Sequence, residues 1–136
     1  MDISVNVTDN SKEVLDALKE QIALAMEAVG ETAEGYAKDG CPVDTGRLRN
    51  SITYATKDYT GSSAYADDEG NSYDDGGALS APEEGTVYIG SNVEYAEKQE
   101  EGEFYKHVVG GAHFLRNAIQ NNTKEYENII KTILET

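Results

Sequence analysis

Residues 41–52 of this chain decide its fold, and they are Cys41-Pro42-Val43-Asp44-Thr45-Gly46-Arg47-Leu48-Arg49-Asn50-Ser51-Ile52. Pro42 keeps the chain extended, because proline disfavours helical geometry at the residue before it. Asp44 is expected to accept hydrogen bonds from backbone N–H groups two or three residues further on and so to cap a tight turn. Gly46 allows the close approach or the positive φ that such a turn needs. Since Leu48 and Ile52 then return to the core, the segment predicts a rigid corner between a helix and a strand.

The region before this corner has the periodicity of a long helix. Apolar residues recur at steps of three and four, which predicts an amphipathic helix over residues 11–39: Leu15, Leu18, Ile22, Ala25 and Val29. Gly40 is expected to end it. The remaining face is charged and is expected to lie in water, with Lys12, Lys19, Glu20, Glu27, Glu31 and Glu34. A core helix and a partner-binding helix both fit this pattern.

The region after the corner predicts a small sheet and a second long helix. Alternating apolar residues predict strands over 51–58 and 86–90, which we expect to pair antiparallel, and short strands over 3–7 and 104–109. A short acidic helix is expected to end near residue 101, and the apolar spacing of 112–135 predicts a second amphipathic helix. Residues 1–136 are therefore predicted to form a single α+β domain, with two long amphipathic helices packed on one face of a small, mainly antiparallel sheet.

Residues 59–85 differ from the rest in composition, because they are rich in Gly, Ser, Asp and Tyr. We expect a long acidic loop or a flexible hairpin there.

The charge of the chain restricts its partners. The formal net charge is -15, and residues 58–103 contain 13 acidic residues against one lysine. Nucleic acids and anionic membranes both attract basic surfaces, so binding to either is not expected. No signal peptide is expected, because the first residues lack a basic start and an apolar run. The longest apolar stretch, residues 22–26, is too short to span a bilayer.

Neither a catalytic centre nor a cofactor site is predicted. The sequence contains no phosphate loop, dinucleotide fingerprint or nucleophile elbow, and the single cysteine, Cys41, is interpreted as a small apolar core residue. His107 and His113 do not have the spacing of a helical pair of metal ligands. Residues 67–75 offer carboxylates for calcium, but their glycine stands at the wrong offset for the twelve-residue loop. An acidic binding module that depends on calcium is the alternative interpretation of this region.

Two groups of residues carry a resemblance to a known family. The corner matches a P-V-D-T-G-x-L-R-x-S-I pattern at Pro42, Val43, Asp44, Thr45, Gly46, Leu48, Arg49, Ser51 and Ile52. Later matches follow in order at Gly90, Ser91, Tyr95, Ala96, Glu100 or Glu101, Gly102, Phe114, Leu115, Arg116 and Ala118. Over about residues 10–135 the chain resembles the tail-component family of siphophages, the small head–tail joining, neck or tail-completion proteins.

The resemblance implies an assembly protein without catalytic residues. Such a protein forms a homo-oligomeric ring, expected here to be a hexamer, between the phage connector and the tail-tube proteins. DNA passes through such a ring without sequence-specific binding, and no membrane is involved. The expected location is the head–tail junction of the virion, after synthesis in the bacterial host cytoplasm.

All three arginines of the chain fall within the matching segments. Arginine suits partly buried pairing with carboxylates. The candidate subunit-interface residues are therefore Arg47, Arg49, Arg116, Tyr95 and Glu101. Structural pairing within one chain is an equally weighted alternative.

Overall fold

The structure, a computed structural model, describes residues 11–74, 83–101, 111 and 113–135. Its helices and strands follow one another as α1 (Ser11–Gly40), α2 (Arg47–Ser51), β1 (Thr53–Ala55), β2 (Ala64–Ala66), β3 (Ser72–Asp74), β4 (Tyr88–Gly90), α3 (Ala96–Glu101), α4 (Phe114–Gln120) and α5 (Thr123–Leu134). The predicted strands 3–7 and 104–109 lie outside the described residues. None of the described helices is long and apolar enough to cross a membrane.

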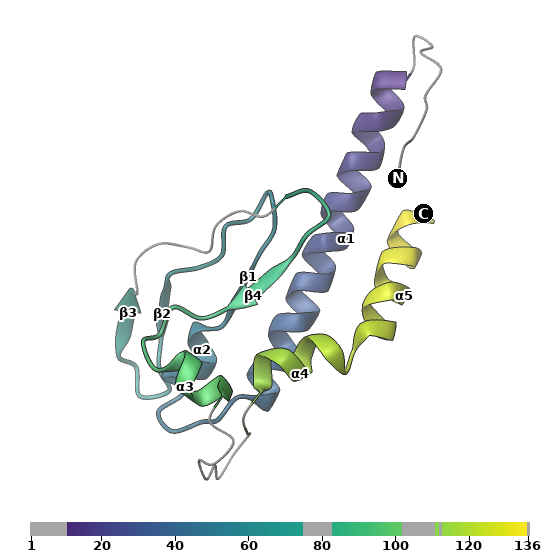
Figure 1. The fold of residues 1–136 in the computed structure, drawn as a ribbon. Helices are drawn as coiled ribbons and strands as arrows, with labels where there is room; N and C mark the ends of the chain where they lie inside the picture. Colours follow the sequence, from purple (N-terminus) through teal and green to yellow (C-terminus); the bar gives the residue numbers. More distant parts are fainter. Residues whose placement is uncertain (1–10, 75–82, 102–110, 112, 136) are drawn as a thin grey trace.

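The helix α1 packs against α2, α4, α5, β1 and β4, and it confirms the helix predicted over 11–39. Figure 1 shows α1 between the β1–β4 ribbon and α5. Its central buried positions are small, with Ala25, Ala33 and Ala37 almost fully enclosed. Small side chains let neighbouring elements approach the helix closely, so the predicted stripe from Ala25 onwards is the surface on which the fold is assembled, whereas Leu15 and Leu18 at its start are exposed.

The sheet next to α1 consists of β1 and β4, which pair antiparallel as predicted. Tyr54 lies opposite Ile89, and Ala55 lies opposite Tyr88. The first strand is shorter than the predicted 51–58, because Ser51 belongs to α2 and its hydroxyl donates to the carbonyl of Leu48. A long helix packed on a small antiparallel sheet confirms the α+β class.

The segment over 59–85 contains a second two-stranded sheet. β2 and β3 pair antiparallel, with Tyr65 opposite Tyr73, and the turn between them runs from Asp67 to Asn71. β2 packs against α2. The hairpin is therefore attached to the corner.

The C-terminal helical region is divided into α4 and α5, whereas the sequence predicted one helix over 112–135. In an uninterrupted helix the carbonyl of Ala118 accepts from the backbone N–H of Asn122. Here that carbonyl accepts from the Asn122 side chain at 3.0 Å and from the Tyr126 hydroxyl. Asn122 leaves helical geometry, with φ at -128°. Both helices consequently lie against α1.

The main core cluster lies beneath the corner. It contains residues from α1, α2, α3, α4 and the connecting segments: Ala37, Cys41, Leu48, Ile52, Val93, Ala96, Phe114 and Ala118. Phe114 and Ile52 are its largest fully enclosed side chains. The corner is thus both a turn of the chain and a wall of the core.

Candidate functional site

The turn at the corner depends on Gly46. Its φ of 84° lies in the left-handed region, and a Cβ on Gly46 would lie 2.5 Å from the carboxylate of Asp68. This confirms that the turn needs glycine. The cap predicted at Asp44 is wrong: its carboxylate is exposed, and the hydroxyl of Thr45 accepts from the backbone N–H of Arg47 at 3.3 Å instead. The acceptor is therefore one residue nearer to the helix than the pattern indicated.

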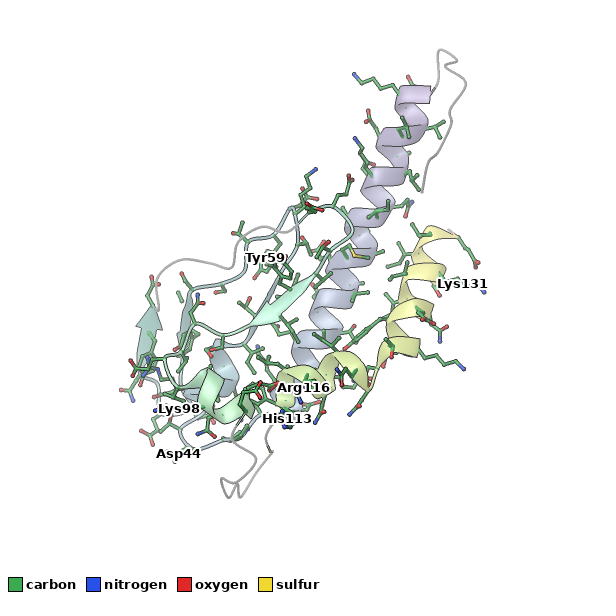
Figure 2. All side chains as sticks on the ribbon, in the orientation of Figure 1. Asp44, Tyr59, Lys98, His113, Arg116 and Lys131 are labelled. Atoms are coloured by element: carbon green, nitrogen blue, oxygen red, sulfur yellow. The ribbon has the colours of Figure 1, made fainter. Side chains whose placement is uncertain are left out.

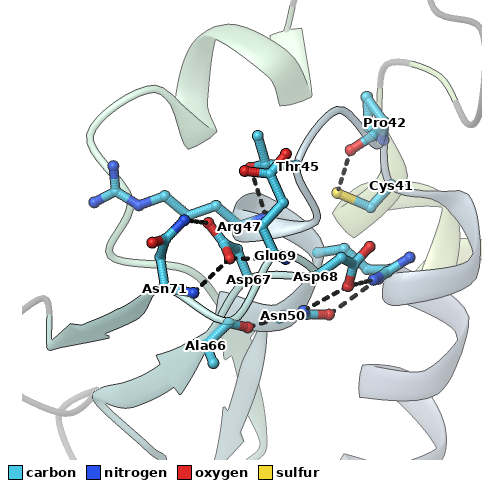
Figure 3. A network of polar contacts seen from close by, with 11 residues as sticks. Cys41, Pro42, Thr45, Arg47, Asn50, Ala66, Asp67, Asp68, Glu69 and Asn71 are labelled. Atoms are coloured by element: carbon cyan, nitrogen blue, oxygen red, sulfur yellow. Dashed lines mark hydrogen bonds and ion pairs between the residues drawn. The ribbon is translucent and has the colours of Figure 1, made fainter.

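Asp68 fastens the hairpin to the corner (Figure 3). Its carboxylate forms an ion pair with Arg49 and accepts from the side chain of Asn50 at 3.1 Å. Its backbone N–H donates to the carbonyl of Thr45 at 2.8 Å. The hydrogen bond from Asn50, followed by that from Arg49, holds the pKa of Asp68 below its ordinary value. The Asn50 amide also donates to the carbonyl of Ala66 at 2.9 Å, so backbone and side chains join the two elements.

Asp67 closes the hairpin turn from inside. Its buried carboxylate accepts from the backbone N–H of Asn71 at 2.9 Å, from the Asn71 amide at 3.1 Å and from the Tyr73 hydroxyl at 3.0 Å. Burial alone raises the pKa of Asp67, but the hydrogen bonds from Asn71 and Tyr73 outweigh it and lower the pKa. Two of the carboxylates in residues 67–75, those of Asp67 and Asp68, are therefore engaged within the fold. Among the described residues, no three metal-ligating side chains gather into a site.

Arg47 connects the corner to three tyrosines. Its Nε donates to the hydroxyl of Tyr65 at 3.2 Å, and its guanidinium carbon lies 4.2 Å from the ring centre of Tyr73. The ring of Tyr95, from the segment after β4, is 5.9 Å away. Because a guanidinium is attracted to aromatic faces, Arg47 holds the hairpin and this later segment together. Two of the candidate interface residues, Arg47 and Tyr95, thus meet within one subunit.

Arg116 lies where α3 meets the start of α4 (Figure 2), with its guanidinium 3.5 Å from Glu101. The neighbouring Glu100 is buried and accepts from the backbone N–H groups of Leu115 and Arg116 at 3.2 and 2.8 Å. Its backbone carbonyl accepts a hydrogen bond from the backbone N–H of His113 at 2.7 Å. Glu100 is therefore the cap of α4.

The corner contacts the segment after β4 through a pair of serines, one from each group of residues that carries the family resemblance. The hydroxyls of Ser51 and Ser91 are 2.5 Å apart, and Ser91 also accepts from the backbone N–H of Val93. Cys41 lies in the core cluster, where burial raises the pKa of its thiol to about 12. A thiol with this pKa is protonated at neutral pH and is a poor nucleophile. The contacts of Arg47, Asp67, Asp68 and Glu100 with their partners hold the corner, the hairpin and α4 together, and we call this group of residues the joint.

Each candidate interface arginine has a partner within the subunit. The intrachain alternative therefore has geometric support for Arg47, Arg49 and Arg116, and their role between subunits stays a prediction. Sequence reasoning missed Asp67, Asp68 and Glu100 as joint residues. For the hairpin a signal was present, because Ala64-Tyr65-Ala66 and Ser72-Tyr73-Asp74 alternate on either side of a Gly70-Asn71 turn.

Comparison with known protein families identifies a family that matches most of the chain. The family model described as "Bacteriophage HK97-gp10, putative tail-component" matches residues 6–102. These residues include α1, the corner, both small sheets and α3. No curated protein and no solved structure matches the chain. Since the family model covers well over half of the sequence, this chain belongs to the HK97-gp10-like family of bacteriophage tail components.

Proposed function

We propose that this protein is a ring-forming structural component of the head–tail interface, in the neck or at the tail terminus. The observation that carries the proposal is membership of a phage tail-component family. In this proposal six copies form a closed ring that contacts the connector on one side and the tail-tube proteins on the other. The protein acts by holding surfaces in place and not by catalysis.

The joint described above supports this role. Asp68, Arg47 and Glu100 each tie together elements that are distant in sequence, so the subunit presents its outer surfaces in one arrangement. A ring subunit needs such stiffness, because a small angular error at one interface is repeated around the ring.

The charge also supports this role. Most of the net charge of -15 comes from residues 58–103. Negative surfaces repel the phosphates of DNA, so an acidic ring lets DNA pass without adhering to it.

Deletion of the gene from the phage tests the proposal. We expect electron micrographs to show DNA-filled heads and separate tails, and infectivity to return when the gene is supplied from a plasmid. Virions that remain joined and infectious without the gene would overturn the assignment. A calcium titration of the purified protein should leave its stability unchanged, whereas a saturable rise would favour a calcium-binding module instead.

A further inference from the structure

An apolar groove with an acidic rim opens beside the middle of α1. It encloses about 410 Å³ between α1 and the segment after β1, and its lining residues are Glu20, Ala23, Leu24, Glu27, Thr56, Asp58 and Tyr59. Leu24 is 55% exposed and Tyr59 is 37% exposed. The lining therefore combines two partly exposed apolar side chains with the carboxylates of Glu20, Glu27 and Asp58.

The wall of this groove is held in place by Thr56. The buried Thr56 hydroxyl accepts from the backbone N–H of Tyr59 at 3.1 Å, and the Thr56 N–H donates to the carbonyl of Tyr59 at 2.7 Å. The Tyr59 ring packs against that of Tyr54 at 4.6 Å between centres. Figure 2 shows Tyr59 beside α1. The groove is thus preformed, which lowers the entropic cost of filling it.

Within the part of the chain that the structure describes, the first turns of α1 form a second exposed surface. Every described side chain from Lys12 to Glu20 is exposed, including Val14 at 63%, Leu15 at 39% and Leu18 at 41%. Figure 1 shows these turns extending past α5 and past the sheet. The exposed leucines of these turns offer apolar area that a partner could bury. Lys12 and Lys19 lie three residues before and four residues after Leu15, and therefore on the same side of the helix.

The two surfaces complement each other in charge and in polarity. The side of the first turns that holds Leu15 also holds Lys12 and Lys19, whereas Glu13, Asp16 and Glu20 follow one another at steps of three and four along the neighbouring side. The groove has the carboxylates of Glu20, Glu27 and Asp58 among its lining, together with Leu24 and Tyr59. Glu20, Leu24 and Glu27 share one side of α1, whereas Lys12, Leu15 and Lys19 share a different side. A surface that fits a different surface of an identical molecule makes a head-to-tail contact, which closes into a ring when the rotation allows it.

We propose that the first turns of α1 of each subunit occupy the acidic groove of the next subunit. This inference rests on the proposed function, because it names the contact that builds the ring. Leu15 and Leu18 pack on Leu24 and Tyr59, and the ammonium groups of Lys12 and Lys19 pair with the carboxylates of the rim. Pairs of this kind give specificity and direction, and the apolar contact contributes most of the affinity.

A charge exchange between the two surfaces tests the contact. One variant carries Lys12→Glu and Lys19→Glu, and the other carries Glu20→Lys and Glu27→Lys. In a phage lacking the gene, each variant alone should reduce the yield of joined virions at least tenfold. Co-expression of both should restore it, because each altered surface then meets an oppositely charged partner. Light scattering of the purified variants, alone and mixed at several ionic strengths, should show the same pattern of assembly.

Matched controls separate this contact from net charge and from folding. Lys124→Glu with Lys131→Glu, and Glu127→Lys with Glu135→Lys, make the same charge changes at exposed positions of α5 and of its C-cap. These controls should assemble like the wild type, and circular dichroism should show equal helicity for all variants. Single variants that support normal yields would overturn the groove contact while leaving the ring intact. Variants that each fail and are not restored by co-expression would also overturn it. A gene deletion without effect would instead overturn the proposed function itself.

Discussion

Gly30 of α1 lies directly against the aromatic ring of Tyr54 of β1, and a Cβ at Gly30 would overlap atoms of that ring. Tyr54 is buried there, and burial, followed by the charges of Glu31 and Glu27, raises its pKa to about 12. The distance between the long helix and the sheet is therefore set by the absence of one methyl group.

Gly30→Ala should lower the free energy of unfolding by about 1–3 kcal/mol, the usual cost of overpacking a filled site. Alanine is the better helix former, so this sign opposes helix propensity. Gly35→Ala is the matched control: Gly35 is an exposed position of the same helix with no neighbour near its Cβ position. It should raise the free energy of unfolding by about 0.5–1 kcal/mol. Urea denaturation of both variants measures the difference, and equal stabilisation by the two substitutions would contradict the contact with Tyr54.

Gly46→Ala should destabilise the protein by more than about 1–2 kcal/mol, the cost of left-handed geometry alone. The additional loss of stability is expected because the carboxylate of Asp68 occupies the space that a Cβ would take. Gly70→Ala is the control, because Gly70 has a φ of 87° and open space around it. Asp44→Ala should change stability by less than about 0.5 kcal/mol, as expected for an exposed residue. Thermal unfolding of the three variants checks this order, and a large loss at Asp44 would restore it as the cap.

Asp68→Asn should remove the part of the acid sensitivity that Asp68 gives to the contact between the hairpin and the corner. The folded pKa of Asp68 is lowered, so its contribution to stability is present above the unfolded pKa of about 3.9 and is lost as pH falls through the folded pKa. The stability gap between the wild type and Asp68→Asn should therefore be constant between about pH 5 and 7 and shrink below about pH 4. Urea unfolding at several pH values measures this gap. A gap that widens on acidification would contradict the assignment.

Cys41 should resist alkylation in the native protein. Burial raises its thiol pKa to about 12, so very little thiolate exists at pH 8. Iodoacetamide should label the urea-unfolded chain quickly and the native chain at least a hundredfold more slowly, as read by mass spectrometry. Rapid labelling of the native protein would show that the core beneath the corner opens.

Patterns that repeat along the sequence predicted the main elements correctly. The stripe from Leu15 to Val29 and the stop at Gly40 locate α1, and alternation around Tyr54 and Ile89 identifies the paired strands. α2 escaped detection because five residues are too few to show helical periodicity. The break at Asn122 depends on which donors reach the carbonyl of Ala118, and no periodic pattern encodes that choice.

The joint itself could be predicted only in part. Gly46, Leu48 and Ile52 have roles that follow from backbone geometry and apolarity, and these roles are confirmed. Arg49 and Asp68 are 19 positions apart and pair because the hairpin folds back against α2. Neither residue type indicates where the hairpin lies, so the pairing could not be predicted from the sequence. Without a known arginine partner, the composition of an acidic segment is typical of a loop exposed to water. Residues 67 and 68 are therefore assigned from composition alone to a long acidic loop or a flexible hairpin.

The long-range cap formed by Glu100 has a practical consequence for imaging the assembled particle. Its carboxylate and carbonyl fix the start of α4 from α3, and the N–H of Gly111 donates to the carbonyl of Gly40 at 3.1 Å. Glu100 and Gly111, which stand on either side of residues 102–110 in the sequence, are therefore each held by contacts between described residues. A short epitope inserted between residues 105 and 106 should leave both anchors in place. Antibody fragments bound to that epitope would mark each copy of the protein on intact virions in electron micrographs.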